Sequence, residues 1–187
     1  GMARLTVKNS GLGDLDRYVV YELWRYYIAC LKCLLETGKR PLQFDFSQRA
    51  TDLIRFDLDL PVSTSKAFAA LTDADMLDNW LAYGAKTDIR KGGSIDYGWG
   101  VDPVEITELE QNRLLTTAWP DGSEVTFGIE SAGAEAKITL LHSGFSDPQE
   151  AERTRHGWMV LLMGLAMHLL TGANMNDWLG AEDAPGC

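Results

Sequence analysis

The stretch Trp158-Met159-Val160-Leu161-Leu162-Met163-Gly164-Leu165-Ala166-Met167-His168-Leu169-Leu170 is almost wholly apolar, and it decides how the rest of the chain must fold. It belongs to a predicted helix that begins after Ser146, which can cap the first turn, and ends at Gly172. Asp147 and Pro148 both suit the first turn of a helix. Because the apolar half has no polar side, it must be covered on two sides, and a sheet can supply one of them.

Length and composition favour one domain with an appendage. The chain has 187 residues, of which 45% are hydrophobic, enough for one good core but not for a second full domain. Its formal net charge of −10 argues against nucleic acids and acidic membranes as partners, because both need a concentrated basic surface. The apolar stretch is shorter than the roughly 18 residues that span a bilayer, and no signal peptide opens the sequence. We therefore expect a soluble cytoplasmic protein.

The cysteines, Cys30, Cys33 and Cys187, do not form the pattern of a secreted disulfide framework. The spacing Cys30-x-x-Cys33 occurs in redox and zinc sites, but here it lies in an apolar helical segment without a second cysteine pair or a nearby histidine. We interpret both side chains as buried thiols that pack between helices, with redox or metal chemistry as the alternative.

Residues 14–37 form the first predicted helix, with Asp14 as its cap and apolar side chains at helical spacing. The segment 24–38 has the same length as 158–172, and both begin with Trp and end with Thr-Gly. This pattern indicates either a repeated helix or convergence on common helix spacing. Because the C-terminal helix needs a second cover, we predict that the segment 18–35 packs on its outer side, within the chain or across a dimer.

The main domain is expected to begin near Thr51, after a polar linker at 41–50. Apolar and polar residues alternate from Ile54 to Leu60, which is the period of a half-buried strand. Two short helices, at 64–71 and 74–81, should follow. Short turns separate the remaining strands and favour antiparallel hairpins; these strands are expected at 83–90, 94–100, 103–109, 112–119, 123–131 and 135–143.

This order predicts an α+β architecture in which a curved antiparallel sheet folds around the long C-terminal helix. Alternate residues of the segments 95–99, 125–129 and 138–142 place an apolar row on one face of each strand. The long apolar helix is the partner that remains for these faces.

Several motifs, in this order, resemble the SRPBCC superfamily, which includes the START and birch-pollen-allergen-like proteins. The motifs are the strand at 54–60 with Pro61-Val62-Ser63-x-x-Lys66-Ala67-Phe68, Trp80, the turn Lys91-Gly92-Gly93, Pro103-Val104-Glu105-Ile106 and Gly157-Trp158-x-x-x-Leu162-x-x-Leu165. Within the superfamily they are most similar to the branch homologous to the C-terminal domain of the activator of heat-shock-protein-90 ATPase. The resemblance covers about residues 53–172. It implies a helix-grip fold with a hydrophobic cavity between the sheet and the long helix.

Pattern and resemblance together divide the chain into an N-terminal helical extension and linker at 1–50, a helix-grip domain at 51–173 and a C-terminal tail at 174–187. The segment 24–38 also resembles the final helix of that branch, whereas the rest of residues 1–50 departs from the single-domain pattern. A homodimer through the N-terminal and C-terminal helices is a further expectation.

The sequence offers little for catalysis. It lacks the phosphate-loop, dinucleotide-binding, nucleophile-elbow and zinc-protease motifs. Of the histidines His142, His156 and His168, the two on the final helix are about 18 Å apart, too far to share one metal ion. We therefore expect no metal site and no cofactor. An enzyme that uses His142, His168 or Tyr97 as an acid or base is kept as an alternative.

An apolar pocket with a few polar groups is typical of small-molecule sites. His168 is polar within an apolar helix, and we interpret it as a core histidine with one hydrogen bond or as a group that orients a ligand. We interpret most of the other candidates as ordinary core residues, with a role in lining a cavity as the alternative; the two interpretations overlap, because core residues can also line a cavity. The candidate lining residues are Trp80, Tyr97, Trp99, Trp119, Phe127, His142, Met159, Met163 and His168.

The leading functional prediction is a binding module whose internal cavity takes a small hydrophobic molecule, without assured catalysis. The second is a chaperone-interacting or other protein-binding domain with a role in the stress response; it depends on the resemblance, and fold alone does not fix function. The third is a cyclase-like or hydrolase-like enzyme.

Overall fold

The computed structural model describes residues 5–8, 10, 17–50 and 52–174, and their secondary structure is a mixture of helices and antiparallel strands. The expected cap Asp14, the domain start at Thr51, Cys187 and nearly all of the C-terminal tail lie outside these residues. The elements are α1 (Arg17–Thr37), β1 (Leu53–Leu60), α2 (Thr64–Thr72), α3 (Ala74–Leu77), β2 (Lys86–Thr87), β3 (Ser94–Asp96), β4 (Val104–Glu110), β5 (Leu114–Ala118), β6 (Glu124–Ala132), β7 (Glu135–Ser143) and α4 (Pro148–Thr171).

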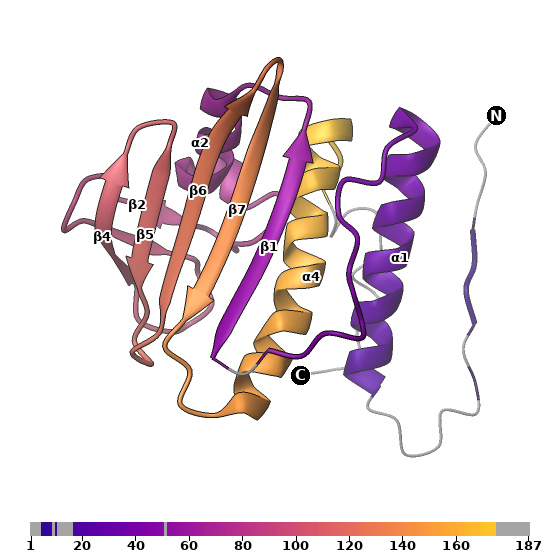
Figure 1. Cartoon of the computed structure of the whole chain (residues 1–187), viewed down its shortest axis with the longest axis horizontal. Helices are drawn as coiled ribbons and strands as arrows, with labels where there is room; N and C mark the ends of the chain where they lie inside the picture. The colour runs from indigo at the N-terminus through magenta and orange to yellow at the C-terminus, as the bar shows by residue number, and fades with distance from the viewer. Residues whose placement is uncertain (1–4, 9, 11–16, 51, 175–187) are drawn as a thin grey trace.

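The strands of the described residues form a 7-stranded sheet in the order β1-β7-β6-β5-β4-β3-β2, and every neighbouring pair is antiparallel. Burial alternates strictly along β1 and β7, so each strand turns one row of side chains inward. The register places Ile54 and Val125 on either side of His142. The sheet curves around α4 (Figure 1), which confirms the predicted α+β helix-grip fold.

The long helix α4 lies between the sheet and α1 (Figure 1). Leu162 and Leu165 on α4 are fully buried, as its apolar composition requires. On the α1 side, the thiol of Cys30 donates to the sulfur of Met163 at 3.5 Å. The predicted second cover is therefore α1, and it is supplied within the chain. Cys33 is fully buried on α1 and Cys30 is half-buried, in keeping with their interpretation as packing thiols.

Asp147, and not the expected Ser146, caps the N-terminus of α4. The Asp147 carboxylate accepts a hydrogen bond from the backbone N–H of Gln149 at 2.8 Å. Pro148 is the first helical residue, and the residue directly before it therefore takes the extended backbone of a cap.

The two long helices end in the same way. Gly38 and Gly172 both adopt a left-handed backbone with φ of 71°, a conformation that glycine adopts without strain. In the preceding residue, the Thr37 hydroxyl donates to Cys33 O at 2.7 Å, and the Thr171 hydroxyl donates to Met167 O at 2.8 Å. The helices run in the same direction, side by side (Figure 1). The similarity that the sequence shows between segments 24–38 and 158–172 is thus also a similarity of local structure.

Some expected elements are shorter in the structure. The strand expected at 94–100 ends at Asp96 in β3, because Gly98 and Gly100 turn the backbone with φ of 71° and 75°. The strand expected at 83–90 is reduced to β2. The helix expected at 74–81 ends at Leu77 in α3, and Asp78 is its C-terminal cap.

The segment 41–50, expected as a polar linker, is bound firmly to α4. Its apolar residues Leu42, Phe44 and Ala50 are buried. The guanidinium of Arg155 on α4 donates to the backbone carbonyls of Asp45 at 2.6 Å and Gln48 at 3.1 Å. The segment therefore runs across α4 between α1 and β1 (Figure 1), and its polar side chains face solvent.

Candidate functional site

Aromatic rings from separate elements meet between the sheet and the N-terminal half of α4. Tyr97 stacks on Trp99 with 5.0 Å between ring centroids, and Trp99 lies 5.9 Å from Trp119. The ring centroids of Trp119 and His142 are 5.8 Å apart. The Phe127 ring packs edge-on against Trp158 of α4, also with 5.8 Å between centroids. We call this group the aromatic cluster; its members are Tyr97, Trp99, Trp119, Phe127, His142, Phe145 and Trp158.

His142 joins the cluster to a chain of buried hydrogen bonds. The indole N–H of Trp158 donates to His142 Nδ1 at 2.9 Å. Because an indole can only donate, Nδ1 is the acceptor and the ring proton is on Nε2. Nε2 then donates to Ser123 Oγ at 2.9 Å, and Ser123 Oγ donates to the Asp121 carboxylate at 2.6 Å. Both ring nitrogens of His142 are therefore occupied.

The surroundings of His142 keep its ring neutral at pH 7. Burial lowers the pKa of His142 to about 4, although the Asp121 carboxylate acts in the opposite direction. For Asp121 itself, partial burial raises the pKa, but the hydrogen bonds from the hydroxyl and N–H of Ser123 outweigh this and lower it overall. A histidine with a low pKa and no free nitrogen is not placed to act as a general base.

Tyr97 differs from its neighbours because its hydroxyl has no hydrogen-bond partner within the described part of the chain. Only 7% of the residue is exposed, and burial raises the pKa of its phenol well above the usual range. The neighbouring indoles are satisfied, since Trp99 Nε1 donates to Leu81 O at 3.0 Å and Trp119 Nε1 to Thr117 Oγ1 at 3.3 Å. The Tyr97 hydroxyl is therefore a polar group of the aromatic cluster that the described residues leave open to a further hydrogen bond.

The other predicted lining residues lie elsewhere. Trp80 is buried beside α2 and donates from Nε1 to Ala70 O at 2.8 Å. Met159 is fully buried on α4, whereas Met163 contacts Cys30 on the α1 side.

His168 has a buried Nδ1 without a hydrogen-bond partner among the described residues. Burial lowers the pKa of His168, and the positive charge of Lys66 adds to this effect. The structure therefore brings five of the predicted lining residues together in the aromatic cluster: Tyr97, Trp99, Trp119, Phe127 and His142.

Sequence reasoning missed Ser123 and Phe145. Ser123 follows the expected turn Pro120-Asp121-Gly122, and its N–H and hydroxyl both donate to the Asp121 carboxylate. An Asp two residues before a Ser in a turn is a recognisable signal of this arrangement. Phe145 packs on His142 with 4.5 Å between ring centroids from the connection before α4, where no periodicity marks it.

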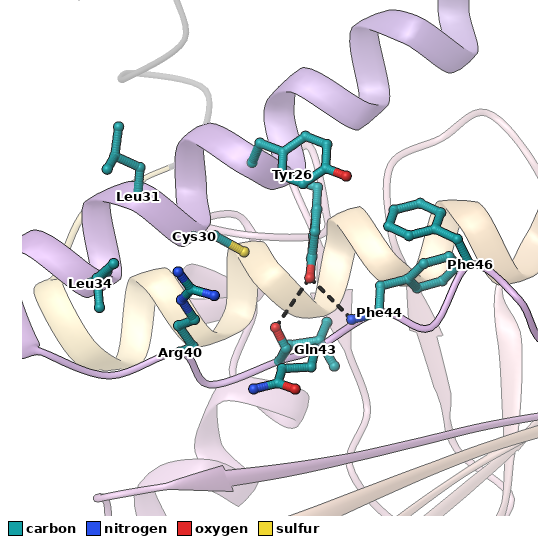
Figure 2. Close-up of a pocket in the computed structure, with 10 residues that line it drawn as sticks. Tyr26, Cys30, Leu31, Leu34, Arg40, Gln43, Phe44 and Phe46 are labelled. Atoms are coloured by element: carbon teal, nitrogen blue, oxygen red, sulfur yellow. Dashed lines mark hydrogen bonds between the residues drawn. The ribbon is translucent and has the colours of Figure 1, made fainter.

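A second site lies on the N-terminal extension. Figure 2 shows a pocket of about 460 Å³ between α1 and the segment 40–46. The Tyr26 hydroxyl holds the two together, because it donates to Leu42 O at 3.2 Å and accepts from Phe44 N at 3.1 Å (Figure 2). Burial raises the pKa of Tyr26 to about 12. The sequence could not show this pocket, since one of its walls was interpreted as a linker.

Two negative findings concern the described residues. No three of their His, Cys, Asp and Glu side chains converge in an arrangement that could hold a metal ion. None of their helices combines the length and the apolar character needed to cross a membrane.

An antiparallel sheet that curves around a C-terminal helix, with aromatic side chains between them, defines a helix-grip protein of the SRPBCC class. The model of the family described as activator of Hsp90 ATPase homolog 1-like protein matches residues 61–169, more than half of the chain. The protein belongs to this family, as the sequence motifs predicted.

Solved structures agree with this assignment at the level of fold. Protein SSP2350 of Staphylococcus saprophyticus is 19% identical, with a TM-score of 0.59 over 65% of this chain and 94% of that one. The Aha1 dimer of Colwellia psychrerythraea is 22% identical, with a TM-score of 0.56 over 64% and 97%. CalU16 of Micromonospora echinospora is 25% identical, with a TM-score of 0.56 over 62% and 72%. Comparison with curated proteins gives no match.

Proposed function

We propose that the helix-grip domain is a binding module for a small, largely aromatic molecule that carries one polar group. The ligand lies against the aromatic cluster, and its polar group pairs with the Tyr97 hydroxyl. The observation that carries this proposal is Tyr97, a residue only 7% exposed and stacked on another ring of the cluster, whose hydroxyl makes no hydrogen bond to the described residues. Small-molecule sites commonly combine aromatic walls with a few such polar groups.

The rings around Tyr97 are partly exposed to solvent. Trp99, Trp119 and Phe145 are half-buried, whereas Tyr97 is buried. Trp99 stands between Gly98 and Gly100, which adopt left-handed backbones that glycine takes without strain. Moving Trp99 aside requires the loss of its stack on Tyr97 and of one hydrogen bond to Leu81 O. In this proposal, the Trp99 side chain moves aside to admit the ligand.

Binding without catalysis is favoured over the enzyme alternative. A cyclase or hydrolase would need an acid or base next to the ligand, and the titratable rings of the aromatic cluster are Tyr97, whose pKa burial raises well above the usual range, and His142. Its neutral state and its two engaged nitrogens make it a structural group. The ligand-binding role of the cluster does not depend on His142 changing its protonation.

Isothermal titration with 2-naphthol, a neutral aromatic molecule with one hydroxyl, tests the proposal. We expect saturable binding, and Tyr97→Phe should weaken it by roughly 3-fold to 10-fold, the effect of one neutral hydrogen bond. Tyr21→Phe on α1 removes a hydroxyl outside the aromatic cluster and should leave the affinity unchanged. Absence of binding, or equal affinity in Tyr97→Phe, would refute the proposed site.

Family membership supports a second candidate, a protein-binding domain that interacts with the Hsp90 chaperone. PFC0360w of Plasmodium falciparum, described as an HSP90 activator, shares the fold with a TM-score of 0.50 and 23% identity over 57% of this chain. This second function would place the protein in the cytoplasm and give it a role in the stress response. If it holds, the purified protein should be retained by immobilised Hsp90 and should change its ATPase rate. No retention and an unchanged rate would remove it.

A further inference from the structure

The pocket on the N-terminal extension lies outside residues 61–169, the part of the chain that matches the family. Its volume of about 460 Å³ falls within the range of small-molecule sites. Tyr27, Leu31 and Phe46 line it and expose 48%, 39% and 44% of their surface. A ligand that covered these side chains would remove apolar surface from water, which favours binding.

The walls of the pocket are fixed before any ligand arrives. The Phe44 and Phe46 rings pack edge-on with 4.6 Å between their centroids, and the Phe46 and Tyr27 rings are stacked with centroids 6.4 Å apart. Beneath them, the guanidinium of Arg155 lies 4.1 Å from the centre of the Phe44 ring. The hydrogen bonds of Tyr26 to Leu42 O and Phe44 N tie α1 to the segment 42–44. Preformed walls reduce the entropy cost of binding.

Arg40 is the one charged residue among the lining side chains, and Figure 2 shows it at the pocket beside Cys30. Within the described residues it forms no salt bridge, although the adjacent Lys39 pairs with Glu135 at 2.6 Å. A guanidinium binds carboxylates with two parallel hydrogen bonds, and no carboxylate from the described part of the chain pairs with this one.

We propose that this pocket binds a small amphipathic carboxylate. The ring or chain of the ligand packs on Tyr27, Leu31 and Phe46, and its carboxylate pairs with Arg40. This site is independent of the one proposed for the aromatic cluster, because it uses α1 and the segment 40–46 and favours an anion over a neutral molecule.

Cys30 lines the pocket and serves as a local reporter. In a Cys187→Ser background, alkylation by N-ethylmaleimide at alkaline pH, mapped by peptide mass spectrometry, measures access to Cys30. We expect 2-naphthoate to slow this alkylation in a saturable way and the neutral 2-naphthol to do so at least about 10-fold less effectively. Equal protection by both compounds, or protection by neither, would overturn the proposal.

The charge dependence is tested by Arg40→Gln, a substitution at an exposed position that removes the charge and keeps a shorter polar side chain. It should weaken 2-naphthoate binding, measured from the protection of Cys30, by about 10-fold or more. Arg113→Gln removes a guanidinium from the β4–β5 turn and is the matched control, with no expected effect. Unchanged protection in Arg40→Gln would refute the role of Arg40 and with it the proposed ligand class, whatever the outcome for 2-naphthol and Tyr97.

Discussion

His142 makes the stability of the protein depend on pH. Its pKa is about 4 in the folded protein and near 6.5 when unfolded. Between these values the unfolded chain binds the proton and the folded protein does not, so stability is lost as the pH falls. The shift corresponds to about 3 kcal/mol across this window.

Urea denaturation at a series of pH values measures this loss. His142→Gln retains an acceptor for Trp158 and a donor for Ser123, so it should fold and show a flatter dependence between pH 6.5 and 4. Part of the slope should persist, because burial also lowers the pKa of His168. His156→Gln, which removes a histidine outside this network, is the matched control. A slope in His142→Gln equal to that of the unmodified protein would show that His142 is not the source.

The hydrogen-bond network of His142 could be predicted from the sequence only in part. Alternation with Ile138 and Leu140 correctly placed His142 on the inward face of its strand. Its partner Ser123 could not be found, because a register that pairs Val125 with His142 is set by tertiary packing between distant residues. Local patterns therefore gave the direction of the side chain but not what it touches.

Arg155 and Glu152 both join α4 to the segment 44–50 through hydrogen bonds, and Arg155 is the buried member of the two. It is 7% exposed, donates to two backbone carbonyls and lies over the Phe44 ring. Arg155→Ala should lower the free energy of unfolding by about 2–3 kcal/mol, from lost charged hydrogen bonds and packing. Arg153→Ala, on the exposed side of the same helix, should change it by less than about 0.5 kcal/mol. Chemical denaturation compares the two, and equal small effects would contradict this role of Arg155.

The helix α1 covers the outer side of α4, so its loss should be costly. Deletion of residues 1–45 would expose the side of α4 that includes Met163 and remove the contact with Cys30. We expect the truncated protein to aggregate or to unfold at a lower Tm, because a large apolar surface would face water. Thermal unfolding and size-exclusion chromatography measure this. A soluble, monomeric fragment with an unchanged Tm would contradict the covering role of α1.

At the scale of the whole molecule, the architecture could be predicted from the sequence and the pocket on the N-terminal extension could not. Burial alternates strictly in β1 and β7, so each strand has one apolar face that must be covered. The apolar helix α4 must be covered as well, and packing it against that face of the sheet satisfies both requirements. In the segment 41–50 the apolar residues Leu42, Phe44 and Phe46 alternate with polar ones, a pattern that the interpretation as a polar linker overlooked, and Leu42 and Phe44 are buried. A homodimer through the terminal helices stays a prediction, and burial of α4 leaves α1 as the helix with an exposed apolar face.

The central claim is that the interior next to Tyr97 receives a ligand, and ¹H–¹⁵N spectra of the tryptophan indole groups test it most directly. Each indole N–H gives its own signal, and Trp99, Trp119 and Trp158 belong to the aromatic cluster, whereas Trp24 is exposed on α1. On titration with 2-naphthol, the signals of Trp99 and Trp119 should move in a saturable way while that of Trp24 remains in place. No change at Trp99 and Trp119, or changes confined to Trp24, would contradict the claim.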